Sequence, residues 1–213
     1  MNKLLLMIIV LIFLKGKTFS QVNRDDALLV YEQGVDLFNQ KHYVGCYQFM
    51  NMSLGYDSTY ANPYVYKAWV LHLMGEGDMA LSYVNKAIHI DSTLAKAYSI
   101  RATIYNAFGR MEEVFDDINK AIEIEPLNGK HYEQRSHYWE DIEIEFEVAE
   151  NKSMDDLNMA IKLNPKMAVA YFNRAQLKES LGDLKGACED WVKAKQLGFK
   201  GFDPCKECDC MDR

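Results

Sequence analysis

Small residues recur every 34 positions along most of this chain, and this period constrains the fold more than any single motif does. Ala27, Ala61 and Ala95 begin successive units of equal length, and Gly129 begins a fourth. Five additional residues inside the fourth unit place the start of a fifth at Ala168. Self-similarity at this period is typical of stacked helix pairs, because no pair can bury its apolar face alone. The sequence therefore predicts an all-α solenoid.

Each unit has the pattern of two amphipathic helices joined by a short turn. In the third unit the first helix is predicted over residues 95–108 and ends at Gly109. The second helix is predicted from about Met111 to Ile124. Pro126 follows, and proline lacks the amide hydrogen that a continuing helix needs. Small side chains at the eighth and twentieth places of the units are expected to let the two helices approach closely.

Opposite charges recur within the last three units. Arginine holds the seventh place and aspartate the twenty-third, whereas the first two units have neither residue there. We expect each pair to form a partly shielded salt bridge between the two helices of its unit, which makes these residues structural rather than catalytic. The three pairs are Arg101 with Asp117, Arg135 with Asp156, and Arg174 with Asp190.

The fourth unit is irregular, and its five-residue excess falls between Trp139 and Ser153. The run Glu140–Glu150 alternates acidic with apolar residues, as a strand would, but an isolated strand has no partner between helix pairs. We expect a lengthened first helix with an extended turn. The run could form an acidic lip or a weak calcium site, but it has no glycine for a calcium loop, which favours a solvated charged helix.

The offsets resemble those of the tetratricopeptide repeat (TPR) family over residues 27–198. The copy with the clearest match contains Ala170–Ala175, Leu181–Asp183 and Ala187–Trp191. The resemblance implies a right-handed superhelix of about five helix-turn-helix repeats whose first helices line a concave groove. The amino-acid sequence of the last repeat also resembles that of repeat proteins secreted by Bacteroidetes. The unit bounds are 27–60, 61–94, 95–128, 129–167 and 168–198.

The resemblance also assigns the residues that line the groove, at the second, fifth, ninth and twelfth places of each first helix. Carried onto this chain, these places are apolar and aromatic at the N-terminal end and polar and acidic toward the C-terminal end. The principal predicted lining residues are Tyr31, Val35, Phe38, Val65, Trp69, His72, Lys96, Asn106, Glu133, His137, Phe172 and Gln176.

Aromatic groove residues are credible anchors for a peptide side chain. The alternative is that the first unit or a short lead helix covers Tyr31, Phe38 and Trp69. The subset of the family that binds chaperone tails holds a carboxylate with lysine, arginine and asparagine. Here Tyr31 and Val35 occupy the corresponding places in the first unit and the third unit offers only Lys96, so we do not expect that clamp.

Residues 1–20 have the pattern of a secretory signal peptide. Lys3 precedes the apolar run Leu4–Leu14, which is short for a membrane span, and cleavage is expected before Gln21. Residues 21–26 would then be a short lead segment, and no stable membrane span would remain. An uncleaved anchor is the alternative, because Lys15 and Lys17 are unusual near a cleavage site. The expected location is the bacterial periplasm or the exterior.

Charge narrows the classes of partner. The three lysines are the only charged residues of the predicted signal segment, so its removal takes the net charge from −7 to −10. A strongly acidic chain is a poor match to nucleic acid, whose phosphates need a basic surface. We expect a protein or peptide partner and no nucleic acid.

The cysteines are the remaining reactive groups. Cys205, Cys208 and Cys210 lie in the tail 199–213. In an oxidising compartment they could form a disulfide within or between chains; a zinc site and free thiols are the alternatives. Cys46 and Cys188 lie at small core places, so both are expected to be inert.

No glycine-rich phosphate loop, nucleophile elbow or paired metal-binding histidines occur in the sequence. The sequence therefore predicts a protein-binding scaffold that is not an enzyme, with no catalytic residue, metal or cofactor. An oligomeric or structural assembly subunit is one alternative, and a redox or metal-binding role of the tail is the other.

Overall fold

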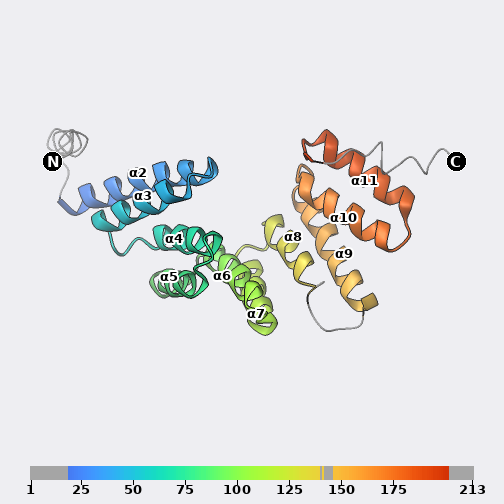
Figure 1. Ribbon diagram of the computed structural model, residues 1–213, viewed down its shortest axis with the longest axis horizontal. Helices are drawn as coiled ribbons and strands as arrows, with labels where there is room; N and C mark the ends of the chain where they lie inside the picture. Colours follow the sequence, from blue (N-terminus) through green and yellow to red (C-terminus); the bar gives the residue numbers. More distant parts are fainter. Residues whose placement is uncertain (1–18, 140, 142–145, 202–213) are drawn as a thin grey trace. The chain divides into compact units, whose positions relative to one another are not determined.

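The structure is a computed structural model that describes residues 19–139, 141 and 146–201 (Figure 1). The described residues form ten helices and no strand, so the chain is an all-α solenoid of helical repeats. The helices are α2 (Phe19–Asn39), α3 (Tyr43–Tyr56), α4 (Ala61–Leu73), α5 (Gly77–Ile90), α6 (Ala95–Ala107), α7 (Met111–Ile124), α8 (Gly129–Tyr138), α9 (Phe146–Leu163), α10 (Ala168–Ser180) and α11 (Leu184–Gln196).

The predicted register agrees with the helix boundaries. Helices α4, α6, α8 and α10 begin at the residues that open the second to fifth units, and α7 has the predicted bounds. Helix α2 differs, because it begins at Phe19 and thus includes the predicted lead segment 21–26. The turns within three pairs use Gly75, Gly109 and Gly182 at φ 85°, 69° and 82°, a conformation that favours glycine.

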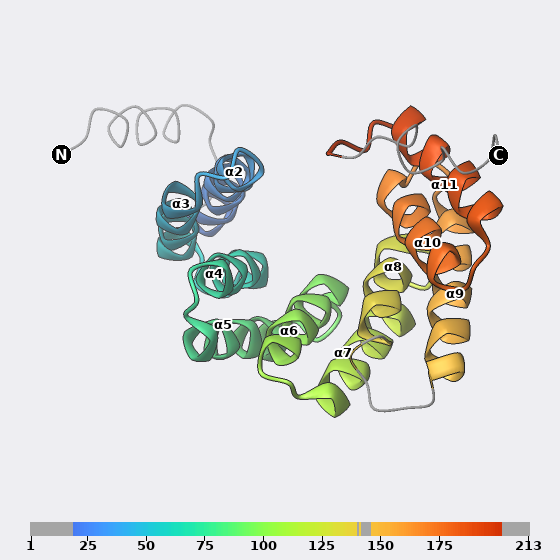
Figure 2. The same ribbon diagram turned by 45° about the vertical axis from the view of Figure 1, so that its right-hand side comes forward.

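The chain forms two compact units, residues 1–104 and 105–213, each longer than one of the five repeats defined from the sequence. From here on, the first and second units are these two, and the 34-residue segments are called repeats. In the first, α2 packs along α3 and α4 along α5; in the second, α8 packs along α9 and α10 along α11 (Figure 2). The larger core of the first unit lies among α4, α5 and α6, and it includes Val65, Val84 and Ile104, which are fully buried. In the second unit Leu157 and Ala160 of α9 pack with Ala170 of α10.

The small places bring paired helices together. A Cβ atom added at Gly34 of α2 would lie 3.0 Å from Cβ of Phe49 on α3, closer than unrelated side chains normally approach. Cys46 and Ala80, at the twentieth place, are fully buried. The period of small residues therefore reflects close contact between the two helices of a pair.

Two of the three predicted salt bridges are confirmed. Arg135 Nη2 lies 2.7 Å from Asp156 Oδ1, and Arg174 Nη2 lies 2.7 Å from Asp190 Oδ1. Each carboxylate accepts a third hydrogen bond: Trp139 Nε1 donates to Asp156 at 2.9 Å, and Lys178 Nζ lies 2.7 Å from Asp190. The remaining pair, Arg101 with Asp117, stays a prediction.

An asparagine ladder accompanies these cations. The cation at the seventh place of each of the second to fifth repeats donates to an asparagine at the twenty-fifth place of the preceding repeat. This ladder was not predicted, although asparagine recurs at that place in four repeats and the signal was therefore present in the sequence. The contacts are Lys67 to Asn51 at 2.7 Å, Arg101 to Asn85 at 2.6 Å, Arg135 to Asn119 at 2.6 Å and Arg174 to Asn158 at 2.7 Å.

The prediction of a lengthened first helix in the fourth repeat was wrong. Helix α8 has 10 residues, and the longer helix is α9, with 18. Glu147 lies in the first turn of α9, where a negative charge is favourable beside the free amide groups of a helix N-terminus. Acidic residues therefore suit the start of the second helix better than the end of the first. Most of the rest of the acidic run lies outside the described residues.

Candidate protein-binding surface

The first unit presents a connected row of aromatic side chains on its first helices, α2 and α4. We call Tyr31, Phe38, Tyr60, Tyr66 and Trp69 the aromatic strip. Their ring centroids are 5.2 Å apart for Tyr31 and Tyr60, 5.6 Å for Tyr31 and Tyr66, 5.4 Å for Phe38 and Tyr66, and 4.6 Å for Phe38 and Trp69. Tyr66 is buried, whereas the other four remain partly exposed.

Basic side chains lie against the strip. Lys96 Nζ of α6 is 3.8 Å from the ring centroid of Tyr66 and 5.3 Å from that of Trp69. Arg24 lies over Tyr60 at 5.4 Å and forms a salt bridge with Asp57 at 3.1 Å. Ammonium and guanidinium groups are attracted to the electron-rich faces of aromatic rings. The strip is therefore an apolar surface with positive charge beside it.

The pKa values on this surface follow from burial. Burial raises the pKa of Tyr31 far above its usual value, and it also raises the pKa of Tyr60 and of Tyr66. Burial lowers the pKa of His72. At neutral pH the three phenols and the imidazole are consequently uncharged, and Lys96 contributes the positive charge.

The structure distinguishes among the predicted lining residues of the first unit. Tyr31, Val35, Phe38, Trp69, His72 and Lys96 are half-buried. Val65 is the exception, because it is fully buried and packs in the core with Ala97 and Ile100 of α6. The next first helix covers it, so Val65 offers no surface to a partner. The aromatic residues pack on one another without being fully covered, an outcome between the two alternatives that the sequence left open.

In the second unit, Glu133 and His137 of the predicted lining form a polar network with Asn173 instead. Asn173 Nδ2 donates to Glu133 Oε1 at 2.9 Å and lies 2.9 Å from His137 Nε2. Asn106 donates to Asp141 at 3.3 Å, and Gln176 is exposed. The predicted gradient from aromatic to polar residues is thus present when the two units are described separately.

Phe172 differs from its neighbours in the second unit, because another residue of the chain covers part of it. Phe199, which follows α11, stacks on the Phe172 ring with centroids 4.2 Å apart and planes 17° apart. The repeat pattern did not predict this contact, since Phe199 falls outside the repeats.

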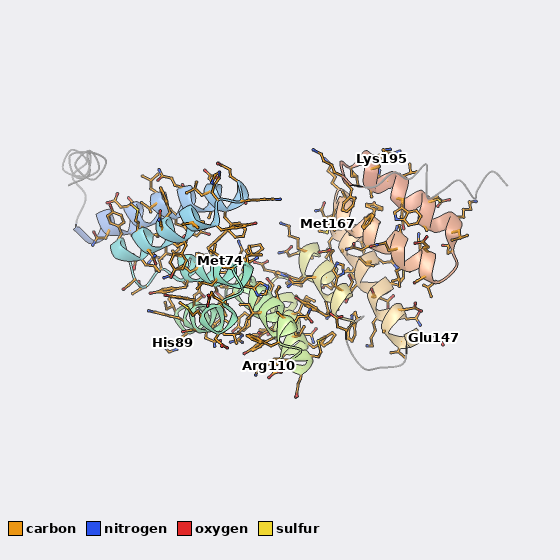
Figure 3. All side chains as sticks on the ribbon, viewed as in Figure 1. Met74, His89, Arg110, Glu147, Met167 and Lys195 are labelled. Carbon is orange, nitrogen blue, oxygen red and sulfur yellow. The ribbon has the colours of Figure 1, made fainter. Side chains whose placement is uncertain are left out.

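A second apolar surface lies at the turn between α2 and α3. Leu37, Tyr43, Val44 and Met74 line a shallow pocket of about 420 Å³, together with Lys41, His42 and Gly45. Val44 is 64% exposed, and Met74, labelled at the end of α4 in Figure 3, is 56% exposed. Sequence reasoning missed this surface because its residues lie at helix ends and in the turn between α2 and α3, outside the places that the repeat assigns to the groove.

The cysteines behave differently from one another. Cys46 is a free thiol, and burial raises its pKa to about 11, although the charge of Lys96 acts in the opposite direction. The prediction that it is inert is supported, because the thiolate is the reactive form. Cys188 differs from this prediction, because it is disulfide-bonded.

Other predicted features of the tail cannot be compared, because Cys205, Cys208 and Cys210 lie outside the described residues. Among the residues that are described, no group of histidine, cysteine or acidic side chains could hold a metal ion. Likewise, no helix in the described ranges is long and apolar enough to cross a membrane.

Comparisons with known proteins identify the fold. No protein-family profile matches the chain. Tetratricopeptide repeat protein 36 of Danio rerio is 46% identical over 55 residues, which are 25% of this chain and 29% of that protein. The chain thus spans less than a third of this curated relative.

Solved structures match a longer part of the chain. A thermophilic TPR protein of Thermus thermophilus superposes with a TM-score of 0.72 at 16% identity, covering 88% of this chain and all of that one. The first TPR of Spaghetti (RPAP3), bound to the HSP90 peptide SRMEEVD, covers 55% of this chain and 95% of that one, with a TM-score of 0.52 at 22% identity. The chain therefore has the fold of tetratricopeptide repeat proteins.

Proposed function

We propose that this protein is a non-enzymatic scaffold that binds a segment of another protein through the aromatic strip of its first unit. The observation that carries the proposal is the strip itself, in which four aromatic rings stay partly exposed and Lys96 lies against the rings of Tyr66 and Trp69. Aromatic side chains on a rigid helical face are the residues that contribute most to binding energy at protein interfaces. The peptide bound to the similar Spaghetti structure supports this mode of use.

The chemistry of the surface indicates what the bound segment contains. An apolar side chain would pack on Phe38 and Trp69, and an acidic group nearby would be favoured by Lys96. The preferred partner is thus an extended or helical segment with an apolar anchor.

The test is selection of peptides from a random library on the purified full chain, followed by affinity measurements on variants. Trp69→Ala should weaken binding about tenfold or more, because it removes a hot-spot ring. Lys96→Glu should weaken the binding of peptides that carry an acidic residue next to the apolar anchor. Met79→Ser is the matched control, since Met79 is exposed in the same unit but lies at the start of α5. Equal affinities for all three variants would refute the proposal, provided circular dichroism shows them folded.

We also propose that the protein is exported into an oxidising compartment of a bacterial cell. The apolar run Leu4–Leu14 supports export, and the disulfide at Cys188 supports an oxidising compartment, because such bonds are rare in the cytosol. Cell fractionation with N-terminal sequencing tests this. A cytosolic protein with an intact N-terminus would contradict it.

Self-association is a second candidate, favoured by the exposed side chains of Val44, Leu73 and Met74 in the first unit. Contiguous apolar surface of this kind often marks a contact between proteins. Light scattering over a range of concentrations should show an oligomer that Val44→Ser with Met74→Ser dissociates. A monomer at all concentrations would remove this candidate.

A further inference from the structure

The turn between α2 and α3 differs from the turns of the other helix pairs at one residue. Lys41 has φ 62°, and in the part of the chain that the structure describes it is the one residue other than glycine with a positive φ. Its amide donates to Phe38 O at 2.9 Å. The next amide, that of His42, donates to Leu37 O at 2.8 Å, and the two bonds together form a Schellman motif. The same motif ends α4, α6 and α10, where glycine takes the left-handed place.

A lysine at this place is unfavourable for the backbone. Left-handed φ values crowd a residue that has a Cβ atom, and glycine would take the same conformation without strain. Residues held in such conformations cluster at functional sites, so an observed outlier is a reason to look for a function. Lys41 lines the shallow pocket of about 420 Å³, together with Leu37 and Tyr43. The strained residue therefore lies at an apolar pocket on the surface.

The centre of the surface around this pocket is apolar. Val44 is 64% exposed, Leu73 48% and Met74 56%. Met74 also lines the pocket and is labelled at the end of α4 in Figure 3. Val44 belongs to the α2–α3 side of this surface, and Leu73 and Met74 belong to the side of the α4–α5 turn. Exposed apolar side chains that gather on one face often mark a contact between proteins.

The charges on the two sides of this apolar centre have opposite signs. Lys41 and His42 lie at the α2–α3 turn, Glu76 and Asp78 follow Met74 at the α4–α5 turn, and all four charged or titratable side chains are exposed. His42 and Glu76 are N-cap residues, and neither side chain makes a capping hydrogen bond. A two-fold axis through the apolar centre would bring each end of the surface against the opposite end in a second copy. The surface is therefore complementary to itself.

We propose that a second copy of this chain covers this surface in a two-fold dimer, in which Lys41 of each copy pairs with Glu76 of the other. The proposal rests on the self-association candidate above and adds its symmetry and its charge pairs. Val44 and Met74 supply the apolar contact at the axis, and the charges decide which turn meets which. An acidic segment of another protein fits less well, because its acids would suit Lys41 but repel Glu76 and Asp78.

Charge exchange in the full chain is the first test, with the mass measured by light scattering over a range of concentrations. Wild type should reach twice the monomer mass and no more, because a two-fold contact closes at two copies. Lys41→Glu and Glu76→Lys should each raise the dimer dissociation constant about tenfold or more, since symmetry places each substitution at two contacts. An equimolar mixture of the two variants should dimerise like wild type, because every exchanged charge then faces an opposite one. A mixture that dimerises no better than the separate variants, or growth beyond two copies, would refute the proposal.

Replacement of Lys41 by glycine is the second test, because it separates backbone strain from the contact. Lys41→Gly should raise the midpoint of urea unfolding, measured at concentrations where both proteins are monomeric, and yet weaken the dimer about tenfold. Lys41→Arg keeps the charge and the strained backbone and should dimerise like wild type. If Lys41→Gly dimerised as tightly as wild type, the lysine would have no part in the contact.

These measurements distinguish the two-fold pairing from self-association in general. A monomer at all concentrations would refute both. A dimer that Val44→Ser with Met74→Ser dissociates, but that the charge substitutions leave unchanged, would support self-association and refute the pairing of Lys41 with Glu76. Peptide affinity at Trp69 is measured separately, so its loss would leave the dimer standing.

Discussion

The two units use the seventh place of the repeat in different ways. In the first unit Lys67 is 5% exposed and lies between two rings, 4.8 Å from the centroid of Tyr47 and 4.0 Å from that of Tyr83. In the second unit Arg135 and Arg174 instead pair with buried aspartates. All three cations also donate to an asparagine of the preceding repeat. From the second repeat to the fifth, the cation at this place links neighbouring repeats, whereas the group that balances its charge differs between Lys67 and the two arginines.

This difference shows why the missing acid in the second repeat does not break the register. Tyr83 occupies the place that aspartate holds in later units, and its ring face receives the Lys67 ammonium. The hydrogen bond from Lys67 also lowers the pKa of Tyr83. An aromatic ring can therefore substitute for a carboxylate at a buried cation, because both offer negative potential at short range.

The largest expected effect is that of Asp190→Ala in the second unit. It leaves Arg174 and Lys178 without their shared carboxylate in a partly buried site, and breaking such a pair typically costs about 3 kcal/mol or more of unfolding free energy. Urea unfolding of both proteins measures it. The surface pair Lys120–Glu123 is the control, since Glu123→Ala should change stability by less than about 1 kcal/mol. Equal effects would mean that the Asp190 pair is no better shielded than a surface pair.

A smaller effect is expected for Lys67→Met in the first unit. Methionine keeps much of the apolar side chain and strands no opposite charge, so the loss is that of cation–π contacts, about 1–2 kcal/mol in a desolvated site. The same unfolding measurement applies, with Lys67→Arg as the variant that keeps the charge. If Lys67→Met lowered the unfolding free energy more than Asp190→Ala does, the aromatic site of the first unit would be the stronger of the two, contrary to expectation.

The asparagine ladder predicts a loss of about 1 kcal/mol for Asn158→Ala, the usual net value of one hydrogen bond, because Arg174 loses an acceptor. Val192 occupies the equivalent place in the fifth repeat, where it is 44% exposed, and it provides a matched control. Val192→Ala should change the unfolding free energy much less. If both substitutions have the same effect, the ladder does not stabilise the stack.

The smallest effect is a dependence on pH. Burial alone raises the pKa of the Asp190 carboxyl, but hydrogen bonds from Arg174 and Lys178 and their charges outweigh it, so the pKa lies below its usual value. The folded state then binds fewer protons than the unfolded state, and this stabilisation is lost as pH falls below about 3.9 toward the lowered pKa. The difference in unfolding free energy between wild type and Asp190→Asn should shrink over that range. A difference that is constant with pH would contradict the paired carboxylate.

Much of the architecture could be predicted because a repeat is a local property. The spacing of Ala61, Ala95 and Gly129 was sufficient to place the first helices, and the covarying arginines and aspartates identified two salt bridges. Each of these features depends on contacts within one helix pair, which recur with the sequence period. The candidate site was less predictable, since Val65 is at a lining place and is nevertheless buried by the next helix.

What the sequence by itself determined is the register: which residues open the first helices of the second to fifth repeats, which small residues lie between paired helices, and which places carry charge. Only the tertiary structure decided what meets those side chains: the two tyrosines around Lys67, the stacking of Phe199 on Phe172, the disulfide at Cys188 and the longer second helix in the fourth unit. The physical reason is that helix periodicity is set by neighbours three or four residues away, whereas these contacts join residues distant in sequence whose proximity depends on how the helices pack.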